Sequence, residues 1–545
     1  METICINSFL NEASLPLSVA VGSALLAAKG SPAQISLEKA EYCVSERGTA
    51  QNFYYISNND AGNKSILFHL KGCKDLVIDG NGSTLTFLGR TIAFAVVDAE
   101  NITLRNFTIR QKRPLFTQGK ILDVGEKWVE IFIDREKYPY SVVGETLHFW
   151  GDEWESDFLY NFLEYDETGY TAYNAGDAHS LAIGCRARQK EDGALRLSFQ
   201  HSHHFRVGNT LVIEHEKRIA PGIFIHNSKN ITLENICIEG SSGMAMIAQH
   251  SENISVDHCV VAPKEGSGNC VSACADATHF VNCKGKIRLN GCTFCAQMDD
   301  GTNVHGIYTV VERALASDIF LLRLGHYQQF GQVYIHPGDS IEFCNSTTLH
   351  PQGVGVAASC VLLDEQHLLL KTEQPLAFDP TGCGVENTST RPEVEIRGCH
   401  IFKNRARSIL LSARGSILVE GNTFSSGGAA VHISGDTNFW FESGRVEDVR
   451  IIGNTFRNCR RFADGWGKAV INIIPEVLET VEGTYFHKNI SIEKNTFVMC
   501  DTAAIWCENT DGLRVAENTF ELTEDYPIRS VDFPQIMIKN TTIIE

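Results

Sequence analysis

The sequence predicts an all-β fold: a right-handed parallel β-helix with two inserted small antiparallel β-barrels and an N-terminal capping helix. Three observations lead to this fold class. A short strand–bend–strand unit recurs along the 545 residues, neighbouring copies are often 23 residues apart, and two long segments interrupt the period. A period near 23 leaves room for three short strands and three turns in each coil, which is typical of a parallel β-helix.

The repeat alternates apolar and polar residues, bends at Gly, Asn, His or Glu, and then resumes an apolar strand. Its copies are NITLRNFTI (101–109), NITLENICI (230–238), NISVDHCVV (253–261), KIRLNGCTF (286–294), EVEIRGCHI (393–401), SILVEGNTF (416–424), DVRIIGNTF (448–456), NISIEKNTF (489–497) and GLRVAENTF (512–520). Four asparagines share one position of the repeat, and stacked coils would align them as an internal ladder that satisfies backbone groups of the bend. They are Asn422, Asn454, Asn495 and Asn518.

The N-terminal segment carries a twelve-residue apolar run, Leu17–Ala28. No Lys or Arg precedes it, so we interpret residues 14–29 as a helix that covers the first coil rather than as a secretion leader. The location expected from the sequence as it stands is therefore cytoplasmic, with a periplasmic or secreted protein as the alternative. No other apolar run approaches the roughly 18 residues of a membrane span.

Two segments break the period, residues 114–221 and 306–391, and both contain strand-rich sequence with turn signals. We predict that each is a small antiparallel β-barrel inserted at a turn of the helix, where insertions into repeats are expected. The predicted organisation is a cap with the first coils (1–113), the first barrel (114–221), central coils (222–305), the second barrel (306–391) and C-terminal coils (392–545). Flat flanks and projecting barrels offer surfaces for a homodimer.

Charge and cysteine content exclude several functions. The formal net charge is −19, and such a surface repels phosphate backbones, anionic lipids and polyanionic sugars. Many of the 18 cysteines lie on predicted buried strands, where thiols fill the core as small apolar groups. The CxxC at Cys292–Cys295 has no second pair at zinc spacing, so we predict neither a metal nor a cofactor.

The densest polar cluster lies in the central coils. Asp276 follows an apolar segment, residues 270–275, and Asp299 with Asp300 follows another, residues 292–298, which we read as two strands one coil apart. Coils stack about 4.8 Å apart, so these carboxylates are expected on one wall, roughly 6 to 9 Å from one another. Such a separation suits an inverting glycoside hydrolase, in which one acid protonates the leaving group and another holds a water. The alternative reading is a solvated acidic turn.

Further residues near the cluster are candidates for substrate binding. They are Gln249, His250, Asn269, Asn303, His305, Arg407 and Trp466, with Arg405 and His432 as further groove residues. Trp466 stands between glycines in a turn, where an aromatic ring serves equally as a stacking platform for a sugar or as packing.

Several of these motifs resemble the glycoside hydrolase family 110 α-1,3-galactosidases. The residues that carry the resemblance are CADATHF (274–280), NCKG (282–285), MDDGTNVHG (298–306), FYYISNND (53–60) and LVIDGNGSTLTFLGR (76–90). The similarity extends from about residue 40 to the C-terminus. Members are bacterial enzymes of carbohydrate metabolism, and some remove terminal galactose from blood group B antigens.

The resemblance implies a metal-independent, inverting exo-hydrolase of glycans that end in α-1,3-linked galactose. It assigns Asp276 as the general acid, and Asp299 and Asp300 as the residues that hold and deprotonate the water. Linear Galα1-3Gal and branched, fucosylated blood group B structures both fall within this expectation.

Three other classes remain open from the residues themselves. A polygalacturonase-like β-helix enzyme would use a similar trio of acids, together with a basic groove for galacturonate, and no RIK-type tripeptide adjoins the cluster. A β-helical adhesin would bind glycans through its flank without cleaving them. A pectate lyase would also need calcium-binding carboxylates and an arginine base.

Overall fold

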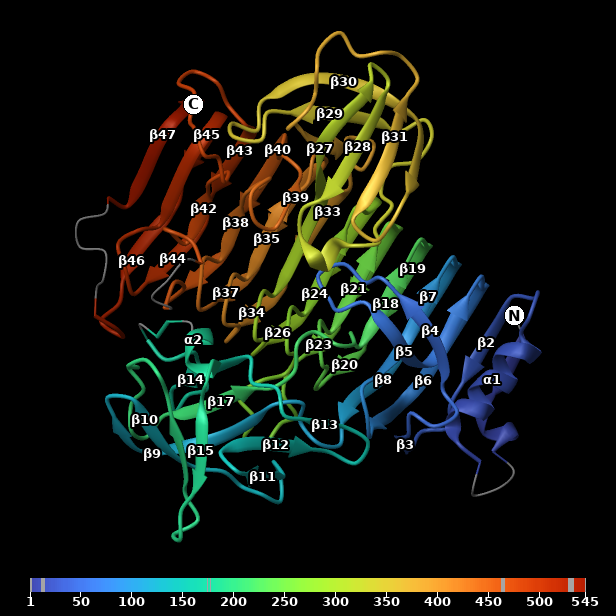
Figure 1. Cartoon of the computed structure of the whole chain (residues 1–545), viewed down its shortest axis with the longest axis vertical. Helices are drawn as coiled ribbons and strands as arrows, with labels where there is room; N and C mark the ends of the chain where they lie inside the picture. Colours follow the sequence, from blue (N-terminus) through green and yellow to red (C-terminus); the bar gives the residue numbers. More distant parts are fainter. Residues whose placement is uncertain are drawn as a thin grey trace.

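The computed structural model of the protein describes residues 2–10, 15–173, 175–176, 178–461, 466–527 and 534–544. Most of the strands wind into one long parallel β-helix, which Figure 1 shows as a stack of coils running from the N-terminal to the C-terminal end. Each coil contributes a strand to each of three walls. The predicted fold class is therefore confirmed.

The first wall carries the acidic cluster at the N-terminal ends of its strands, and we call it the site wall. Its neighbours pair in parallel along the stack. In order they are β5 (Gly62–Lys71), β7 (Thr91–Val97), β18 (Ile223–His226), β21 (Met246–Gln249), β24 (Thr278–Val281), β27 (Thr302–Ala316), β35 (Ile409–Ser412), β38 (Val431–Ile433), β42 (Ile471–Ile473), β45 (Ile505–Ala516) and β47 (Ile536–Ile543).

The other two walls contain the repeat motif itself, one strand on each side of the bend. The second wall consists of β1 (Glu2–Cys5), β2 (Ala33–Ser36), β6 (Lys74–Phe87), β8 (Glu100–Gln111), β19 (Lys229–Glu234), β22 (Glu252–Asp257), β25 (Lys284–Asn290), β33 (Glu393–Arg397), β36 (Ser416–Glu420), β40 (Asp448–Ile452) and β43 (His487–Glu493). The third wall consists of β3 (Glu41–Val44), the second halves of β6 and β8, and β20 (Cys237–Ile238), β23 (Val260–Val261), β26 (Thr293–Cys295), β34 (His400–Phe402), β37 (Thr423–Ser425), β41 (Thr455–Arg457), β44 (Thr496–Met499) and β46 (Thr519–Leu522).

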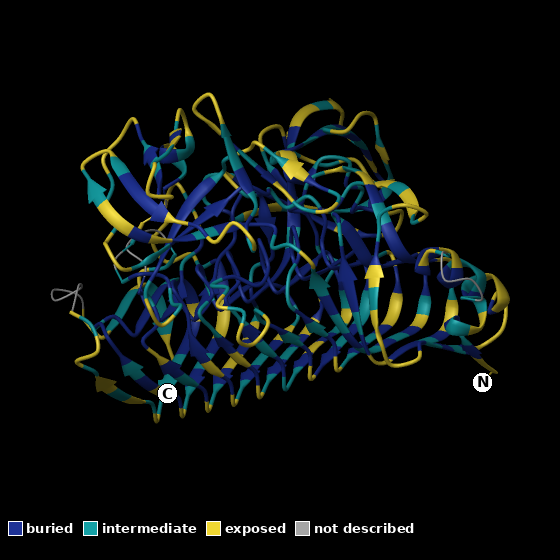
Figure 2. Ribbon diagram, turned by 90° about the horizontal axis from the view of Figure 1, so that it is seen from below, coloured by how far each residue is buried: buried dark blue, intermediate teal, exposed yellow. Residues whose placement is uncertain are grey.

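The interior of the helix is filled by side chains that stack from coil to coil. The predicted asparagine ladder is present: the Nδ2 of Asn422 donates to Oδ1 of Asn454 at 2.9 Å, and Asn454 and Asn495 repeat the contact with the next asparagine. Cys259, Cys292 and Cys399 occupy the same register in the preceding coils. All 18 cysteines are free thiols. Small core-filling groups and amide ladders thus occupy one line of the interior. Figure 2 shows that buried residues recur from coil to coil along the solenoid.

The N-terminal end of the solenoid is covered by the 3₁₀ helix η1 (Ile6–Phe9) and by α1 (Leu17–Ala27). The predicted helix, residues 14–29, is present in shorter form, and residue 14 lies outside the described residues. Leu17, Ala20 and Val21 are buried against the first coil, which places α1 as the expected lid. None of the helices in the described ranges has the length and apolar character that a membrane span requires.

The first insertion lies between β8 and β18. Its antiparallel sheet has the order β14 (Asn161–Tyr165), β17 (Thr210–Glu214), β9 (Thr117–Gly125), β10 (Trp128–Phe132), β16 (Leu195–Ser198) and β15 (Arg186–Gln189). A second sheet, β11 (Tyr140–Val143), β12 (Thr146–Trp150) and β13 (Glu155–Ser156), and the short α2 (His179–Ala182) complete it. Its apolar core extends into the solenoid through Val271, Cys274 and Met298. The first insertion therefore packs under the segments that lead into Asp276 and Asp299.

The second insertion is a closed antiparallel ring in which β27 pairs with β28 (Ile319–Leu324) and β32 (Gly384–Asn387). The ring continues through β31 (His367–Thr372), β30 (Pro351–Leu362) and β29 (Ser340–Cys344), and η2 (Tyr327–Gln329) lies between β28 and β29. The first residues of β27, 302–305, pair with the site wall, and residues 308–316 pair within the ring. One strand therefore joins the second barrel directly to the solenoid. In Figure 1 the two insertions lie on either side of the central coils.

Candidate active site

The three acids lie in the bends that lead into consecutive strands of the site wall. Asp276 precedes β24, and Asp299 and Asp300 precede β27. The N–H of Ala277 donates to the carbonyl of Asp300 at 3.1 Å, which fixes the two bends one coil apart. The expectation that the acids end apolar strands is wrong for residues 270–275. That segment forms no named strand, because Val271 and Cys274 turn away to pack in the core of the first insertion.

The three carboxyl groups are closer together than the sequence predicted. One oxygen from each lies within 4.8 Å of the others, whereas 6 to 9 Å was expected. The bends are stacked in register, so the side chains approach at about the spacing of neighbouring strands. Asp276, Asp299 and Asp300 are 3%, 9% and 2% exposed, respectively. Three acids this close and this buried cannot all be ionised without nearby positive charge.

Two arginines supply that charge. The guanidinium of Arg407 binds both oxygens of Asp300, with Nε to Oδ1 at 2.9 Å and Nη2 to Oδ2 at 2.8 Å. The backbone N–H of Arg407 also donates to Oδ1 at 2.8 Å. Arg218 pairs with Oδ2 of Asp299. The other oxygen of Asp299, Oδ1, is buried and has no hydrogen-bond partner. The pairings leave one carboxylate oxygen in the cluster ready to accept a proton or a hydrogen bond.

The environment separates the proton affinities of the acids. Burial and the neighbouring Asp299 raise the pKa of Asp276 to about 8. Burial also acts on Asp299, but Arg218, together with Arg405 and Arg407, outweighs it and lowers the pKa of that carboxyl. Burial raises the pKa of Asp300 against the opposing charge of Arg407. At neutral pH the cluster therefore contains a protonated Asp276 beside an ionised Asp299.

A chain of hydrogen bonds is compatible with the same protonation state. The carbonyl of Gly306 can only accept, so Nδ1 of His305 donates to it at 2.6 Å. With neutral rings, Nε2 of His305 then accepts from Nε2 of His279 at 2.9 Å, and Nδ1 of His279 accepts from Oδ2 of Asp276 at 2.7 Å. Burial lowers the pKa of His279 well below its usual range, which keeps that ring uncharged. In this arrangement of neutral rings the proton lies on Asp276.

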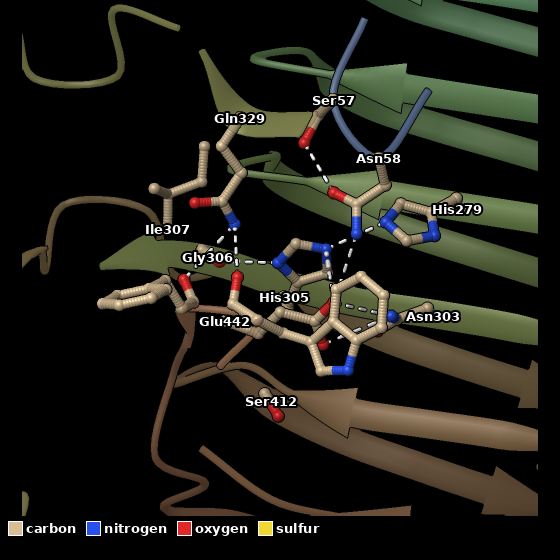
Figure 3. A network of polar contacts seen from close by, with 12 residues as sticks. Ser57, Asn58, His279, Asn303, His305, Gly306, Ile307, Gln329, Ser412 and Glu442 are labelled. Atoms are coloured by element: carbon tan, nitrogen blue, oxygen red, sulfur yellow. Dashed lines mark hydrogen bonds and ion pairs between the residues drawn. The ribbon is translucent and has the colours of Figure 1, made fainter. Parts of the chain in front are cut away.

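A second layer of polar groups surrounds the histidines, as Figure 3 shows. Glu442, in β39 (Glu442–Ser443), accepts from the Nδ2 atoms of Asn58 at 3.3 Å and of Asn303 at 3.4 Å, and it lies 3.6 Å from Nε2 of His305. Burial acts to raise the pKa of Glu442, but His305 and His279 outweigh it and lower that pKa. An ionised carboxylate thus lies beside the two histidines.

These groups line one pocket of about 380 Å³ of space free of protein atoms, which includes its mouth. Its residues are Asn58, Arg218, Asp276, His279, Asp299, Asp300, Asn303, Arg407, Leu410, Trp440, Glu442 and Trp466. Trp466 forms part of the wall, and the guanidinium groups of Arg405 and Arg407 each lie 5.0 Å from the centre of its ring. A small polar pocket with aromatic walls is typical of a site for one small polar ligand.

Not every residue predicted from the sequence lies in this pocket. Gln249 holds the loop that presents Asn58: its Oε1 accepts from the N–H of Ser57 at 2.9 Å, and its Nε2 donates to the carbonyl of Tyr55 at 3.0 Å. His250 bonds to Gln332 of the second barrel at 2.8 Å and lines a separate cavity.

Asn269 accepts from the hydroxyl of Tyr138 at 2.6 Å and also lies in another cavity, at the first insertion. His305 lies behind His279, to which it is hydrogen-bonded, and does not itself line the pocket. His432 is buried against Asn472, while Arg405 donates to the carbonyl of Met298. Of the substrate-binding candidates, Asn303, Arg407 and Trp466 line the pocket, whereas Gln249, His250 and Asn269 lie outside its lining.

Six pocket residues were not singled out as site residues from the sequence: Asn58, Arg218, His279, Leu410, Trp440 and Glu442. His279 lies within the CADATHF motif, three residues after Asp276, so its position beside that acid was the one available signal. Arg218 belongs to the segment that leaves the first insertion, and Glu442 to a long turn between coils. Neither segment carries the repeat, so no period relates them to the acids.

Comparisons with known families match three parts of the chain. The model described as GLAA-B beta-barrel domain I matches residues 117–211, and the model described as GLAA-B beta-barrel domain II matches residues 320–379. A model of a right handed beta helix region matches residues 381–525. Among solved structures, the catalytic domain of Agl-KA covers 99% of this chain and 68% of its own at a TM-score of 0.40 and 10% identity.

Relatives with curated names extend over most of the chain. Alpha-1,3-galactosidase A of Shewanella woodyi is 35% identical over 501 residues, which cover 90% of this chain and 81% of the relative. Alpha-1,3-galactosidase B of Bacteroides thetaiotaomicron is 31% identical over 479 residues, which cover 86% of this chain and 77% of the relative. With both GLAA-B barrel domains and relatives of this length and identity, the chain belongs to the α-1,3-galactosidase family, glycoside hydrolase family 110.

Proposed function

We propose that this protein is an exo-acting, inverting α-1,3-galactosidase that releases terminal galactose from glycans. One observation carries the proposal: a buried pocket holds a protonated carboxyl, Asp276, within 4.8 Å of an ionised carboxylate, Asp299, that has an unpaired oxygen. Glycoside hydrolysis needs a proton donor for the leaving oxygen and a base for the attacking water. The names of the relatives support the linkage.

In this mechanism Asp276 gives its proton to the glycosidic oxygen as the bond from that oxygen to the anomeric carbon breaks. A water bound to Oδ1 of Asp299 attacks the same carbon from the opposite face and transfers a proton to that oxygen. The carboxylate left on Asp276 accepts from the N–H of Asp300 at 3.2 Å and is stabilised by the charges of Arg218 and Arg407. Asp300 acts by orienting Arg407, because both of its oxygens are already occupied.

The bound water rather than a carboxylate is proposed as the nucleophile, and this makes the reaction inverting. Both oxygens of Asp300 and one oxygen of Asp299 accept hydrogen bonds from arginines, which reduces their nucleophilicity. The short separation of the carboxyl groups by itself gives no support to inversion, which usually goes with 6.5–9.5 Å. The support is the pairing of the carboxylates and the family to which the chain belongs.

The burial and charge of the acids support exo action on a neutral sugar. The three acids are almost completely buried, so the end of a glycan reaches them more readily than the interior of a polymer does. Asn58, Asn303 and Glu442 offer hydrogen bonds to hydroxyl groups. The two cations that line the pocket, Arg218 and Arg407, are both paired with aspartates, so among the described lining residues none is left for a galacturonate carboxylate. These features favour galactose over the polygalacturonase alternative.

The proposed reaction also needs no metal. Three carboxylates this close could hold a cation, but Arg218 and Arg407 neutralise two of them and the third carries a proton. The direct test is a galactose-release assay, run in excess chelator, on linear Galα1-3Gal beside the fucosylated B trisaccharide. Release from either substrate supports the proposal. Loss of release on chelation, restored by a divalent ion, would overturn the metal-independent mechanism.

The configuration of the first product tests the mechanism. We expect β-galactose to appear first, because the water attacks opposite the α-linked leaving group. Proton NMR of the anomeric signals during early turnover distinguishes it from α-galactose before mutarotation mixes the two. An initial α product would show retention and would make one of the aspartates a covalent nucleophile.

The pH dependence should reflect the separated acids. Asp276 must be protonated to act, so kcat/KM should fall as the pH rises through about 8. Asp299 must be ionised, and its pKa lies below the ordinary value, so kcat/KM should fall only below about pH 4. Between these limits the profile should include a step near pH 7, because burial raises the pKa of Asp300, which binds Arg407, to about 7. A basic limb two pH units lower, near pH 6, would contradict the assignment of Asp276 as the acid.

A further inference from the structure

A continuous row of aromatic and cationic side chains leads from the pocket onto the surface between the two insertions. It begins at Trp440, which lines the pocket. The ring of Trp440 lies edge-on to Phe439, with centroids 5.2 Å apart, and 4.7 Å from the ring of His326. The row continues to Tyr327, whose ring centre is 4.7 Å from that of His326.

The row then crosses from the second barrel to the first insertion. The Nζ of Lys217 lies 4.8 Å from the centre of the Tyr327 ring and 5.8 Å from the centre of the Tyr160 ring. We call these six residues the aromatic strip: Phe439, Trp440, His326, Tyr327, Lys217 and Tyr160. They come from four separate segments of the chain, including both insertions.

Two rings of the strip are exposed and its other four residues are half-buried, although they contact one another. Phe439 is 64% exposed and Tyr327 is 49% exposed. Large apolar rings are usually buried, and a contiguous exposed group of them marks a binding surface. Their mutual contacts fix the rings in place before any ligand arrives, which reduces the entropy lost on binding.

The chemistry of the strip fits a carbohydrate chain. Aromatic faces pack against the apolar C–H face of a sugar ring, and Lys217 and His326 offer hydrogen bonds to its hydroxyls. The continuity of the strip with the pocket indicates which carbohydrate binds to the strip. A glycan whose terminal galactose lies among the aspartates must leave the pocket past its walls, and Trp440 is both a wall of the pocket and the first ring of the strip.

We propose that the aromatic strip binds the sugars that follow the hydrolysed galactose, so that the enzyme prefers longer oligosaccharides to disaccharides. This inference rests on the proposed function, because it assigns the surface to the remainder of that substrate. Both insertions then have a role in recognition: the first insertion supplies one end of the strip and the second barrel supplies its middle, beside a site that the solenoid builds.

The test compares a long and a minimal substrate. We expect the double variant Phe439→Ala/Tyr327→Ala to lower kcat/KM for a tetrasaccharide ending in Galα1-3Gal by about tenfold, mainly through KM. α-Galactosyl fluoride has no sugar beyond the galactose, so its hydrolysis should change less than about twofold. The wild-type enzyme should also show a higher kcat/KM for the tetrasaccharide than for the disaccharide.

The matched control is Phe132→Ala, which removes a ring of similar exposure, 54%, on β10 of the first insertion. It should alter neither substrate, and equal unfolding temperatures would exclude a folding defect. Equal losses on both substrates, or no loss on the tetrasaccharide, would overturn the role of the strip. Failure of the wild-type enzyme to hydrolyse the fluoride and every Galα1-3Gal glycan would instead refute the proposed function.

Discussion

Replacing Asp276 with Asn should lower kcat/KM for Galα1-3Gal by about 10²- to 10⁴-fold, the range typical of a lost general acid. The amide keeps the shape of the side chain and its contacts with His279 and the N–H of Asp300, but it has no proton to give to the glycosidic oxygen. Initial rates of galactose release at pH 7 measure the effect.

The leaving group provides the sharper readout. Fluoride departs with little help from an acid, so the Asp276→Asn enzyme should retain far more of its activity on α-galactosyl fluoride than on the disaccharide. Asp257→Asn is the matched control, because Asp257 is also a buried aspartate but lies on another wall, where it pairs with Arg288. It should leave both rates unchanged. A loss of equal size on both substrates would remove Asp276 from the acid role.

Replacing Asp299 with Ala should have an effect of similar size, about 10²- to 10⁴-fold, for a different reason. The variant loses Oδ1, the one unpaired carboxylate oxygen of the cluster, and with it the base for the attacking water. Both the disaccharide and α-galactosyl fluoride should be affected, because each requires an activated water. The comparison of the two substrates therefore separates a missing base from a missing acid.

Azide gives an independent check. This anion needs no deprotonation, and the shortened side chain leaves room for it, so azide should partly restore turnover of α-galactosyl fluoride by the Asp299→Ala enzyme. The expected product is β-galactosyl azide. Azide should not restore the Asp276→Asn enzyme on the disaccharide, since the missing group there is a proton donor. An α-configured azide would point to a covalent intermediate instead.

The coils could be predicted because their information is local. A repeat of alternating residues with asparagines in one register fixes both the three walls and the ladder at Asn422, Asn454 and Asn495. The one-coil offset likewise brought Asp276 beside Asp299 and Asp300. In each case the stacking of coils converts a distance along the chain into a contact in space.

The remainder of the pocket could not be predicted in this way. Arg218 and Glu442 come from the exit of an insertion and from a long turn, so their positions depend on how irregular segments pack. The local charge balance of the pocket could not be predicted for the same reason. The net charge of −19 suggested an acidic surface, whereas Arg218 and Arg407 neutralise two of the three acids in the pocket. Gln249 and His250 show the converse error, because closeness in register placed them near the cluster although their side chains serve the neighbouring loop and barrel.

Strand β27 belongs to both the solenoid and the second barrel, and this limits how the sequence of the enzyme can change. Its first four residues hold the bend of Asp299 and Asp300 in register, and the rest of the strand forms part of the wall of the second barrel. Excising or exchanging that barrel as a module would cut the strand that anchors two of the three acids. By contrast, the loops at the rim of the barrel, the end away from the solenoid, can change in sequence and length without cutting this strand. Diversification within this architecture should therefore concentrate at the rim, while the root of the barrel stays fixed.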